Sequence, residues 1–267
     1  MNQNVNQTAS QTASQNASQT VIPIDIHTHF LPKNPGEAII QYSIEDTYEL
    51  EPDQYYSFGV HPRFFHDTVV NMKDPNKLEP DVKKFINRVT AMPEAKRIVA
   101  LGEIGVDLEI SKIPANTPSS KLGKVADLLE KVMSPVVQTS FYVKQIRFTQ
   151  KLHLPCIVHC VKAYEWITKH ISEDVVLPDY MILHGFRRKP EEAKRALKDG
   201  FYLSFGRFFN EETLKMVPDD HLFFETDADP LADIEEIYAR AAQVRGTTPE
   251  ALKDVVRANV SRVFGIK

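Results

Sequence analysis

The stretch IVALGEI, residues 98–104, is a nearly continuous apolar run with one carboxylate close to its end. Seven other stretches are similarly short and mostly apolar, namely VIPIDIH (21–27), AIIQYSI (38–44), YYSFGVH (55–61), PCIVHC (155–160), YMILHG (180–185), FYLSFG (201–206) and LFFETD (222–227). Most of these runs do not alternate with polar residues, which is typical of parallel strands that are covered on both faces. The sequence therefore predicts eight strands of a parallel sheet.

Helical patterns lie between the later strands. They predict helices over residues 138–152, 189–199 and 248–262. In the first of these, Phe141, Phe148 and Leu152 have the spacing of one apolar helix face. In the second, Pro190 stands near the start and Gly200 follows the end, as is common at helix termini.

Eight strands that alternate with helices predict a (β/α)₈ barrel, whose active site lies at the C-terminal ends of the strands. The first two units leave little room for helices, so we expect the barrel to be distorted there. The alternative is a doubly wound open sheet. Such a sheet usually has a glycine-rich turn after its first strand, and this chain has none.

Composition limits the remaining possibilities. Residues 1–20 (MNQNVNQTASQTASQNASQT) carry no charge or aromatic group and do not resemble a secretory signal, so we expect a disordered tail, with residues 21–267 forming one barrel. A net charge of −4 and a pI of about 6.2 argue against a broad basic surface that binds nucleic acid. No apolar run approaches the roughly 20 residues of a membrane span. Cys156 and Cys160 are too far apart on one strand for a disulfide, which favours a reducing, cytoplasmic location.

Ionisable residues recur where the predicted strands end. The set is His27, His29, His61, Glu103, His159, His184 and Asp227. In a barrel these positions converge, and imidazole with carboxylate but without thiolate suits Zn²⁺, Mn²⁺, Fe²⁺, Co²⁺ or Ni²⁺ better than Mg²⁺. Such a set is too large for one tetrahedral ion and suits two ions with a bridging carboxylate.

An ordered series of motifs carries a family resemblance over residues 22–267. The motifs are HTH (27–29), GVHP (59–62), GEIGVD (102–107), Gln138-Phe141-Gln145, LPCIVHC (154–160), LHGF (183–186), ETDADP (225–230) and NVSRVFG (259–265). Together they resemble the TatD-like metal-dependent hydrolases of the amidohydrolase superfamily. The resemblance implies DNase activity, commonly supported by Mg²⁺.

The resemblance also implies roles for individual residues. His27, His29 and Asp227 would hold a first metal ion, His159 and His184 a second, and Glu103 would bridge them. His61 would face the substrate. The cofactors expected are therefore two divalent ions, Mg²⁺, Mn²⁺ or Zn²⁺.

The chain departs from the family pattern at three places. The family commonly has H-S-R-D-A where this chain has His159-Cys160-Val161-Lys162-Ala163, and C-F-S-G where it has residues 185–188, GFRR. The stretch 108–137 is longer than usual and includes a predicted helix at 121–133. We expect either a lid over the active site or a neutral surface insertion.

Five basic residues follow strand ends: Arg63, Lys162, Arg187, Arg188 and Arg207. They favour a phosphate-bearing substrate, such as DNA or a small phosphodiester, since arginine matches phosphate oxygens well. We therefore expect a phosphodiesterase or deoxyribonuclease in which Asp227, His61 and Glu103 are catalytic, with no stable protein partner. Two alternatives are an amidohydrolase or lactonase that acts on a small carbonyl substrate, and a metal-binding barrel without catalysis.

Overall fold

The computed structural model describes residues 21–70, 78–110 and 122–267. It contains an eight-stranded sheet in which each strand pairs in parallel with the next along the chain, in the order β1 to β8. The strands are β1 (Asp25–Thr28), β2 (Ala38–Tyr42), β3 (Tyr55–Phe58), β4 (Ile98–Asp107), β5 (Cys156–Val161), β6 (Met181–Leu183), β7 (Phe201–Phe205) and β8 (Leu222–Phe224). All eight predicted strands are present.

The sheet closes between its first strand and the segment after its last. Thr28 and Asp227 form an isolated parallel bridge. The backbone N–H of Asp227 donates to the carbonyl of His27 (2.9 Å), and that of His29 donates to the carbonyl of Asp227 (3.2 Å). The predicted (β/α)₈ barrel is thereby confirmed, and its closure places His27, His29 and Asp227 side by side.

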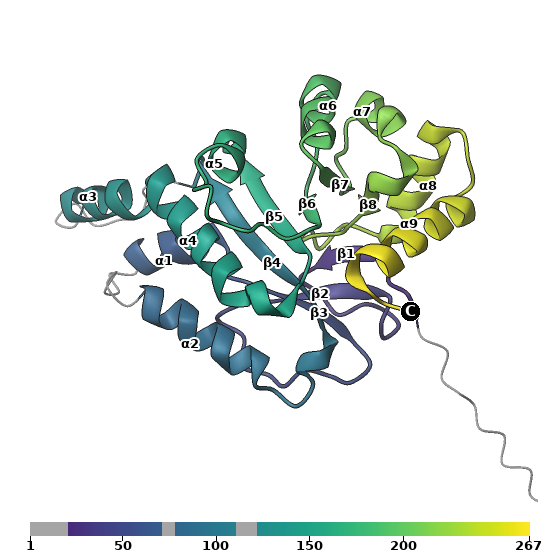
Figure 1. Cartoon of the computed structure of the whole chain (residues 1–267). Helices are drawn as coiled ribbons and strands as arrows, with labels where there is room; N and C mark the ends of the chain where they lie inside the picture. The colour runs from purple at the N-terminus through teal and green to yellow at the C-terminus, as the bar shows by residue number, and fades with distance from the viewer. Residues whose placement is uncertain (1–20, 71–77, 111–121) are drawn as a thin grey trace, which may run out of the picture.

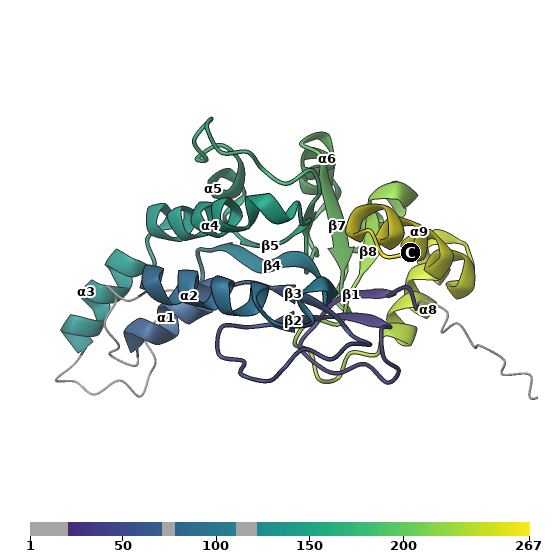
Figure 2. The ribbon, with the colours of Figure 1, turned by 60° about the horizontal axis from the view of Figure 1, so that its bottom comes forward.

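Helices surround most of the barrel (Figures 1 and 2). They are α1 (Pro62–Val70), α2 (Leu78–Thr90), α3 (Leu122–Val132), α4 (Pro135–Thr149), α5 (Tyr164–Thr168), α6 (Pro190–Lys198), α7 (Glu211–Met216), α8 (Ile234–Arg245) and α9 (Pro249–Phe264), with short 3-10 turns at Ala95–Arg97, Gln150–Leu152 and Asp219–His221. Residues 29–37 and 43–54, which connect the first three strands, contain no helix. The barrel is therefore distorted in its first two units, as the sequence predicts.

The buried face of α4 differs from the prediction. Phe141 is buried, but Phe148 and Leu152 are 37% and 43% exposed, so the predicted apolar face was wrong. Two glutamines are buried instead. Gln138 Oε1 accepts the N–H of Asp107 (2.8 Å) and its Nε2 donates to the Asp107 carbonyl (3.0 Å).

The second glutamine, Gln145, binds the loop after β3 in the same way. Its Oε1 accepts the N–H of Val60 (2.7 Å) and its Nε2 donates to the Val60 carbonyl (3.1 Å). Val60 precedes His61, so this pair of hydrogen bonds fixes the backbone that carries the histidine. Helix α4 therefore supports the C-terminal ends of β3 and β4 through its polar side chains as well as through packing.

Replacing Gln145 with leucine is expected to lower the free energy of unfolding by about 1–3 kcal/mol, because the buried N–H and carbonyl of Val60 lose their partner. Urea unfolding measures the change. The exposed Gln150, one residue past the same helix, provides the control, and Gln150→Leu is expected to change stability by less than about 0.5 kcal/mol. Equal effects of the two substitutions would contradict this role for Gln145.

The insertion at 108–137 is described in part. Helix α3 is present at the predicted place, and the side chains of Leu129, Val132 and Met133 are buried in the smaller of two hydrophobic clusters, with residues of α1, α2, β2 and β3. Residues 111–121 lie outside the described residues, so the predicted lid stays a prediction. Among the helices described, none has the length and apolar character needed to cross a membrane.

Candidate metal centre

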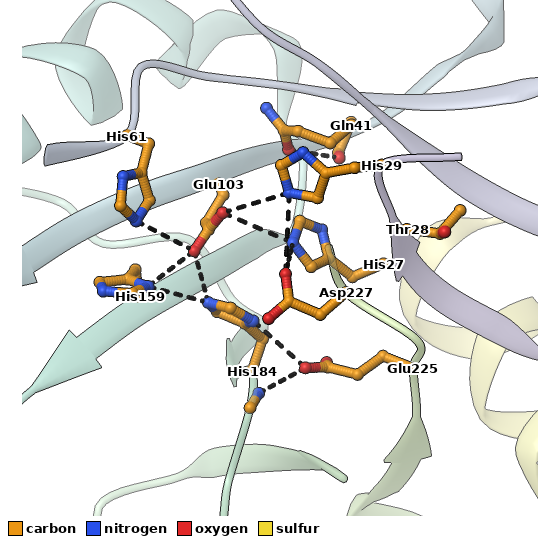
Figure 3. A network of polar contacts seen from close by, with 12 residues as sticks. His27, Thr28, His29, Gln41, His61, Glu103, His159, His184, Glu225 and Asp227 are labelled. Carbon is orange, nitrogen blue, oxygen red and sulfur yellow. Dashed lines mark hydrogen bonds and ion pairs between the residues drawn. The ribbon is translucent and has the colours of Figure 1, made fainter. Parts of the chain in front are cut away.

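The barrel brings all seven predicted site residues to one end. Their ring nitrogens and carboxylate oxygens surround the side chain of Glu103, as Figure 3 shows. The sequence predicts that each of them lies at or just past the end of a strand. This prediction is wrong for Glu103. Strand β4 continues to Asp107, so Glu103 lies within it and points into the barrel mouth.

Two glycines flank Glu103 and let β4 approach β5 closely. A Cβ on Gly105 would lie 1.9 Å from the carbonyl oxygen of His159, and one on Gly102 would lie 2.6 Å from the Cβ of Ile157. Only glycine fits at such distances, and both residues also have positive φ angles. The glycines of GEIG thus bring Glu103 of β4 and His159 of β5 into contact.

Glu103 is buried and contacts five histidines. Its Oε1 lies 2.6 Å from His184 Nε2, 2.7 Å from His159 Nδ1 and 3.3 Å from His61 Nε2, and its Oε2 lies 3.5 Å from His27 Nε2 and 3.8 Å from His29 Nε2. The two oxygens therefore face two different groups of nitrogens.

The first group has the spacing of metal ligands. His27 Nε2 and His29 Nε2 lie 3.5–3.8 Å from Glu103 Oε2 and 3.6–3.7 Å from Asp227 Oδ1. A tetrahedral ion with bonds of about 2.0–2.2 Å separates its ligand atoms by about 3.3–3.6 Å. Both ring nitrogens of His27 are buried without a hydrogen-bond partner among the described residues. These four residues fit a divalent ion.

The second group is more tightly spaced. His159 Nδ1 lies 2.7 Å from Glu103 Oε1 and 3.2 Å from His184 Nε2, which are hydrogen-bond distances. The nitrogen and oxygen atoms of this second group are of the kinds that bind metals, but an ion between them would require the side chains to move apart.

Carboxylates dominate the electrostatics of the cluster. Burial acts to lower the pKa of His27, but Asp227 and Glu103 raise it to about 9. Burial also acts to lower the pKa of His184, but Glu103 and Glu225 hold it well above its usual range. Burial acts to raise the pKa of Glu103, yet the surrounding histidines keep this pKa well below its usual value. The buried carboxylates therefore favour positive charge at this position, whether protons or metal ions supply it.

Comparison with known proteins identifies the family. Residues 3–265 match the model of the TatD-related DNases. The chain belongs to this family. Among curated relatives, the uncharacterized metal-dependent hydrolase YcfH of Escherichia coli K12 is 28% identical over 79% of this chain and 74% of its own length. The 3′-5′ ssDNA/RNA exonuclease TatD of Citrobacter rodentium is 24% identical over 80% of this chain and 78% of its own.

Solved structures show the same fold. The TatD homologue YjjV of E. coli K12 superposes with a TM-score of 0.63 at 17% identity, covering 93% of this chain and 100% of that one. A hydrolase of the TatD family from Entamoeba histolytica gives a TM-score of 0.61 at 15% identity, covering 94% and 100%. The resemblance inferred from the motifs is confirmed, and with it the class of metal-dependent hydrolases.

Two further carboxylates of this TatD-family centre were missed by the sequence analysis. Asp107 Oδ2 lies 2.8 Å from Nε2 of His159, and Glu225 Oε1 lies 3.2 Å from Nδ1 of His184. Both are buried, and each holds the ring nitrogen that faces away from Glu103. Carboxylates in this position orient metal-binding imidazoles. The signal was present, because each is an even number of residues from a cluster carboxylate in the motifs GEIGVD and ETD.

Replacing Asp107 with alanine is expected to weaken binding of the second ion about 10- to 100-fold, because the ring of His159 loses its orienting partner. Titration with Mn²⁺, followed by calorimetry, measures this. Asp107→Asn keeps an oxygen acceptor and is expected to retain most of the affinity. Unchanged binding in the alanine variant would contradict the orienting role.

Two pockets flank the cluster, and both are lined by His159 and Asp227. The first pocket, of about 500 Å³, lies beside His61 and contains Arg63. The second pocket, of about 1090 Å³, lies at the ends of β5 to β8 and contains the other four predicted basic residues, Lys162, Arg187, Arg188 and Arg207. All five predicted basic residues thus line the two pockets beside the cluster, one in the first pocket and four in the second.

Proposed function

We propose that this protein is a metal-dependent phosphodiesterase that acts on DNA or its fragments. The observation that carries the proposal is the group of His27, His29, Glu103 and Asp227, whose ligand atoms have metal-site spacing in a mouth rimmed by basic side chains. The relative from C. rodentium is named as an exonuclease on single-stranded DNA and RNA, which supports the same substrate class.

We assign two ions to the cluster, the second of which would require its ligands to move apart. His27, His29 and Asp227 would hold the first, His159 and His184 the second, and both would share Glu103. When bound, divalent ions such as Mg²⁺, Mn²⁺ or Zn²⁺ would polarise the scissile bond and lower the pKa of a water molecule. We assign the remaining steps to side chains of the chain.

We assign Asp227 the role of the base. Its side chain is 44% exposed, whereas those of Glu103, His27 and His184 are nearly or fully buried, so it is the cluster carboxylate that water can reach. A carboxylate within hydrogen-bond reach of a water molecule can accept its proton during attack.

We assign His61 the donation of a hydrogen bond to the substrate. Its Nδ1 accepts the backbone N–H of Arg63 (2.9 Å), and burial lowers the pKa of the ring. The neutral imidazole therefore carries its hydrogen on Nε2, the atom that points into the cluster 3.3 Å from Glu103. There it can stabilise charge on a substrate oxygen.

Hydrolysis of bis-p-nitrophenyl phosphate under added Mg²⁺, Mn²⁺ and Zn²⁺ tests the proposal, with a panel of amides and lactones assayed in parallel. Metal-dependent release of p-nitrophenol is expected. Turnover of a carbonyl substrate without any phosphodiester turnover would overturn it.

One observation favours a carbonyl substrate as the second candidate. The arginine that the family commonly has after the histidine of β5 is absent. The nearby Lys162 forms an ion pair with Glu109 (2.7 Å), so its charge is already compensated. The second pocket also includes apolar and aromatic side chains that would suit a small uncharged substrate. An amidohydrolase or lactonase is therefore the activity to assay second.

A further inference from the structure

We propose that the two pockets divide a single-stranded nucleic acid at the scissile phosphate. The first pocket takes the terminal nucleoside, and the second pocket takes the rest of the chain. The inference rests on the proposed function, because it assumes a phosphodiester at the cluster that both pockets share.

The first pocket is unfavourable for additional phosphates. Besides the cluster carboxylates, it is lined by Glu45, Asp67 and Asp107. Arg63 is the one lysine or arginine among its described lining residues. A phosphate beyond the scissile one would face these carboxylates, whereas an uncharged sugar and base would not. Its volume of about 500 Å³ lies within the range of pockets for one small organic group.

The second pocket offers more basic groups than the first, and it is also lined by six acidic residues, Glu109, Glu165, Glu192, Glu225, Asp227 and Asp229. It is lined by six basic residues, Lys162, Arg187, Arg188, Lys189, Arg195 and Arg207. Four of them are paired with carboxylates, namely Lys162 with Glu109, Arg188 with Glu192, Arg195 with Glu165 and Arg207 with Asp229. Arg187 and Lys189 are exposed and have no ion pair within the described part of the chain. Both side chains are thus available to successive phosphates.

The second pocket also offers a surface for bases. Phe208 lines it with 67% of the residue exposed, and the guanidinium of Arg207 lies 5.4 Å from the ring centre. Leu231 lines the same pocket and is 73% exposed. An exposed aromatic ring in the same pocket as two unpaired cations, Arg187 and Lys189, is a combination that suits single strands, because bases stack on the ring while phosphates meet the cations. With about twice the volume of the first pocket, it has room for more than one nucleotide.

The first experiment measures kcat/KM on single-stranded oligonucleotides of two, four and eight residues. The wild-type value is expected to rise with length. Arg187→Ala and Phe208→Ala are expected to lower it more for the octamer than for the dinucleotide, by about 5- to 100-fold in the case of the stacking residue. Lys194→Ala removes an exposed cation of α6 that does not line the pocket, and it is expected to match the wild type at every length. Equal losses at all lengths would overturn the assignment of the second pocket.

The second experiment places a phosphate on either end of the octamer. A phosphate on the end that enters the first pocket is expected to lower kcat/KM, and a phosphate on the other end is not. The double variant Glu45→Gln, Asp67→Asn is expected to reduce that penalty, because both carboxylates line the first pocket. A penalty that is absent, equal at both ends, or unchanged in the double variant would overturn the assignment of the first pocket.

Turnover of bis-p-nitrophenyl phosphate distinguishes a failure of the proposed function from a failure of the pocket assignment. A wild-type enzyme that hydrolyses neither this ester nor any oligonucleotide refutes the proposed function. One that hydrolyses the small ester but shows no effect of oligonucleotide length refutes only the division of the strand between the pockets.

Discussion

Asp227→Asn is expected to lower turnover of a phosphodiester by about three orders of magnitude, because the amide cannot accept a proton from water. The variant should keep at least part of its metal, since its side-chain oxygen remains beside His27 and His29. Steady-state hydrolysis of bis-p-nitrophenyl phosphate and elemental analysis of the same preparation measure the two quantities. Loss of turnover with metal retained is what distinguishes a base from a residue that acts only as a ligand.

Asp229→Asn provides the matched control for this prediction. Asp229 lies two residues further along, and its carboxylate contacts Arg207 rather than the cluster. Its replacement is expected to change turnover by less than about tenfold. Near-normal activity of Asp227→Asn would remove Asp227 as the base.

Glu103→Gln is expected to have the largest effect on metal content. Glu103 is the residue that contacts both groups of nitrogens, and its charge acts with Asp227 to raise the pKa of His27 and with Glu225 to raise that of His184. Without that charge, the affinity for both ions should fall by more than the 10- to 100-fold expected for loss of an orienting carboxylate. The metal-to-chain ratio should fall from close to two to below one, and turnover should become undetectable.

The control for Glu103 is Glu109, two residues beyond the same strand. Glu109 pairs with Lys162, and Glu109→Gln is expected to leave the metal content unchanged. Circular dichroism of both variants checks that they are folded. Two bound ions in folded Glu103→Gln would show that the carboxylate does not bridge the sites.

The sequence predicted the convergence of the site because parallel strands bring their C-terminal ends to one edge of a barrel. It was wrong about the position of Glu103. Strand β4 continues its pairing with β5 as far as Asp107 and Val161, beyond the point where the apolar run is interrupted. The close approach of β4 to β5 at Gly102 and Gly105 permits this extension, and that approach is a tertiary feature.

Buried polar residues account for the other errors. Periodicity selects apolar residues, so it assigned Phe148 to the core and overlooked Gln138 and Gln145, which are buried because they bond to the backbone at strand ends. The same bias overlooked Asp107 and Glu225 behind the two histidines. Their spacing from Glu103 and Asp227 was a signal for their position, but their roles depend on which nitrogen of each ring faces Glu103, which the spacing does not give.

We propose that the cluster binds two divalent ions that share Glu103. The most direct test is anomalous diffraction from crystals grown with Mn²⁺, recorded on both sides of the manganese absorption edge. The account predicts two anomalous peaks, one among His27, His29 and Asp227 and one beside His159 and His184, with Glu103 in contact with both. No peak within the cluster would contradict it.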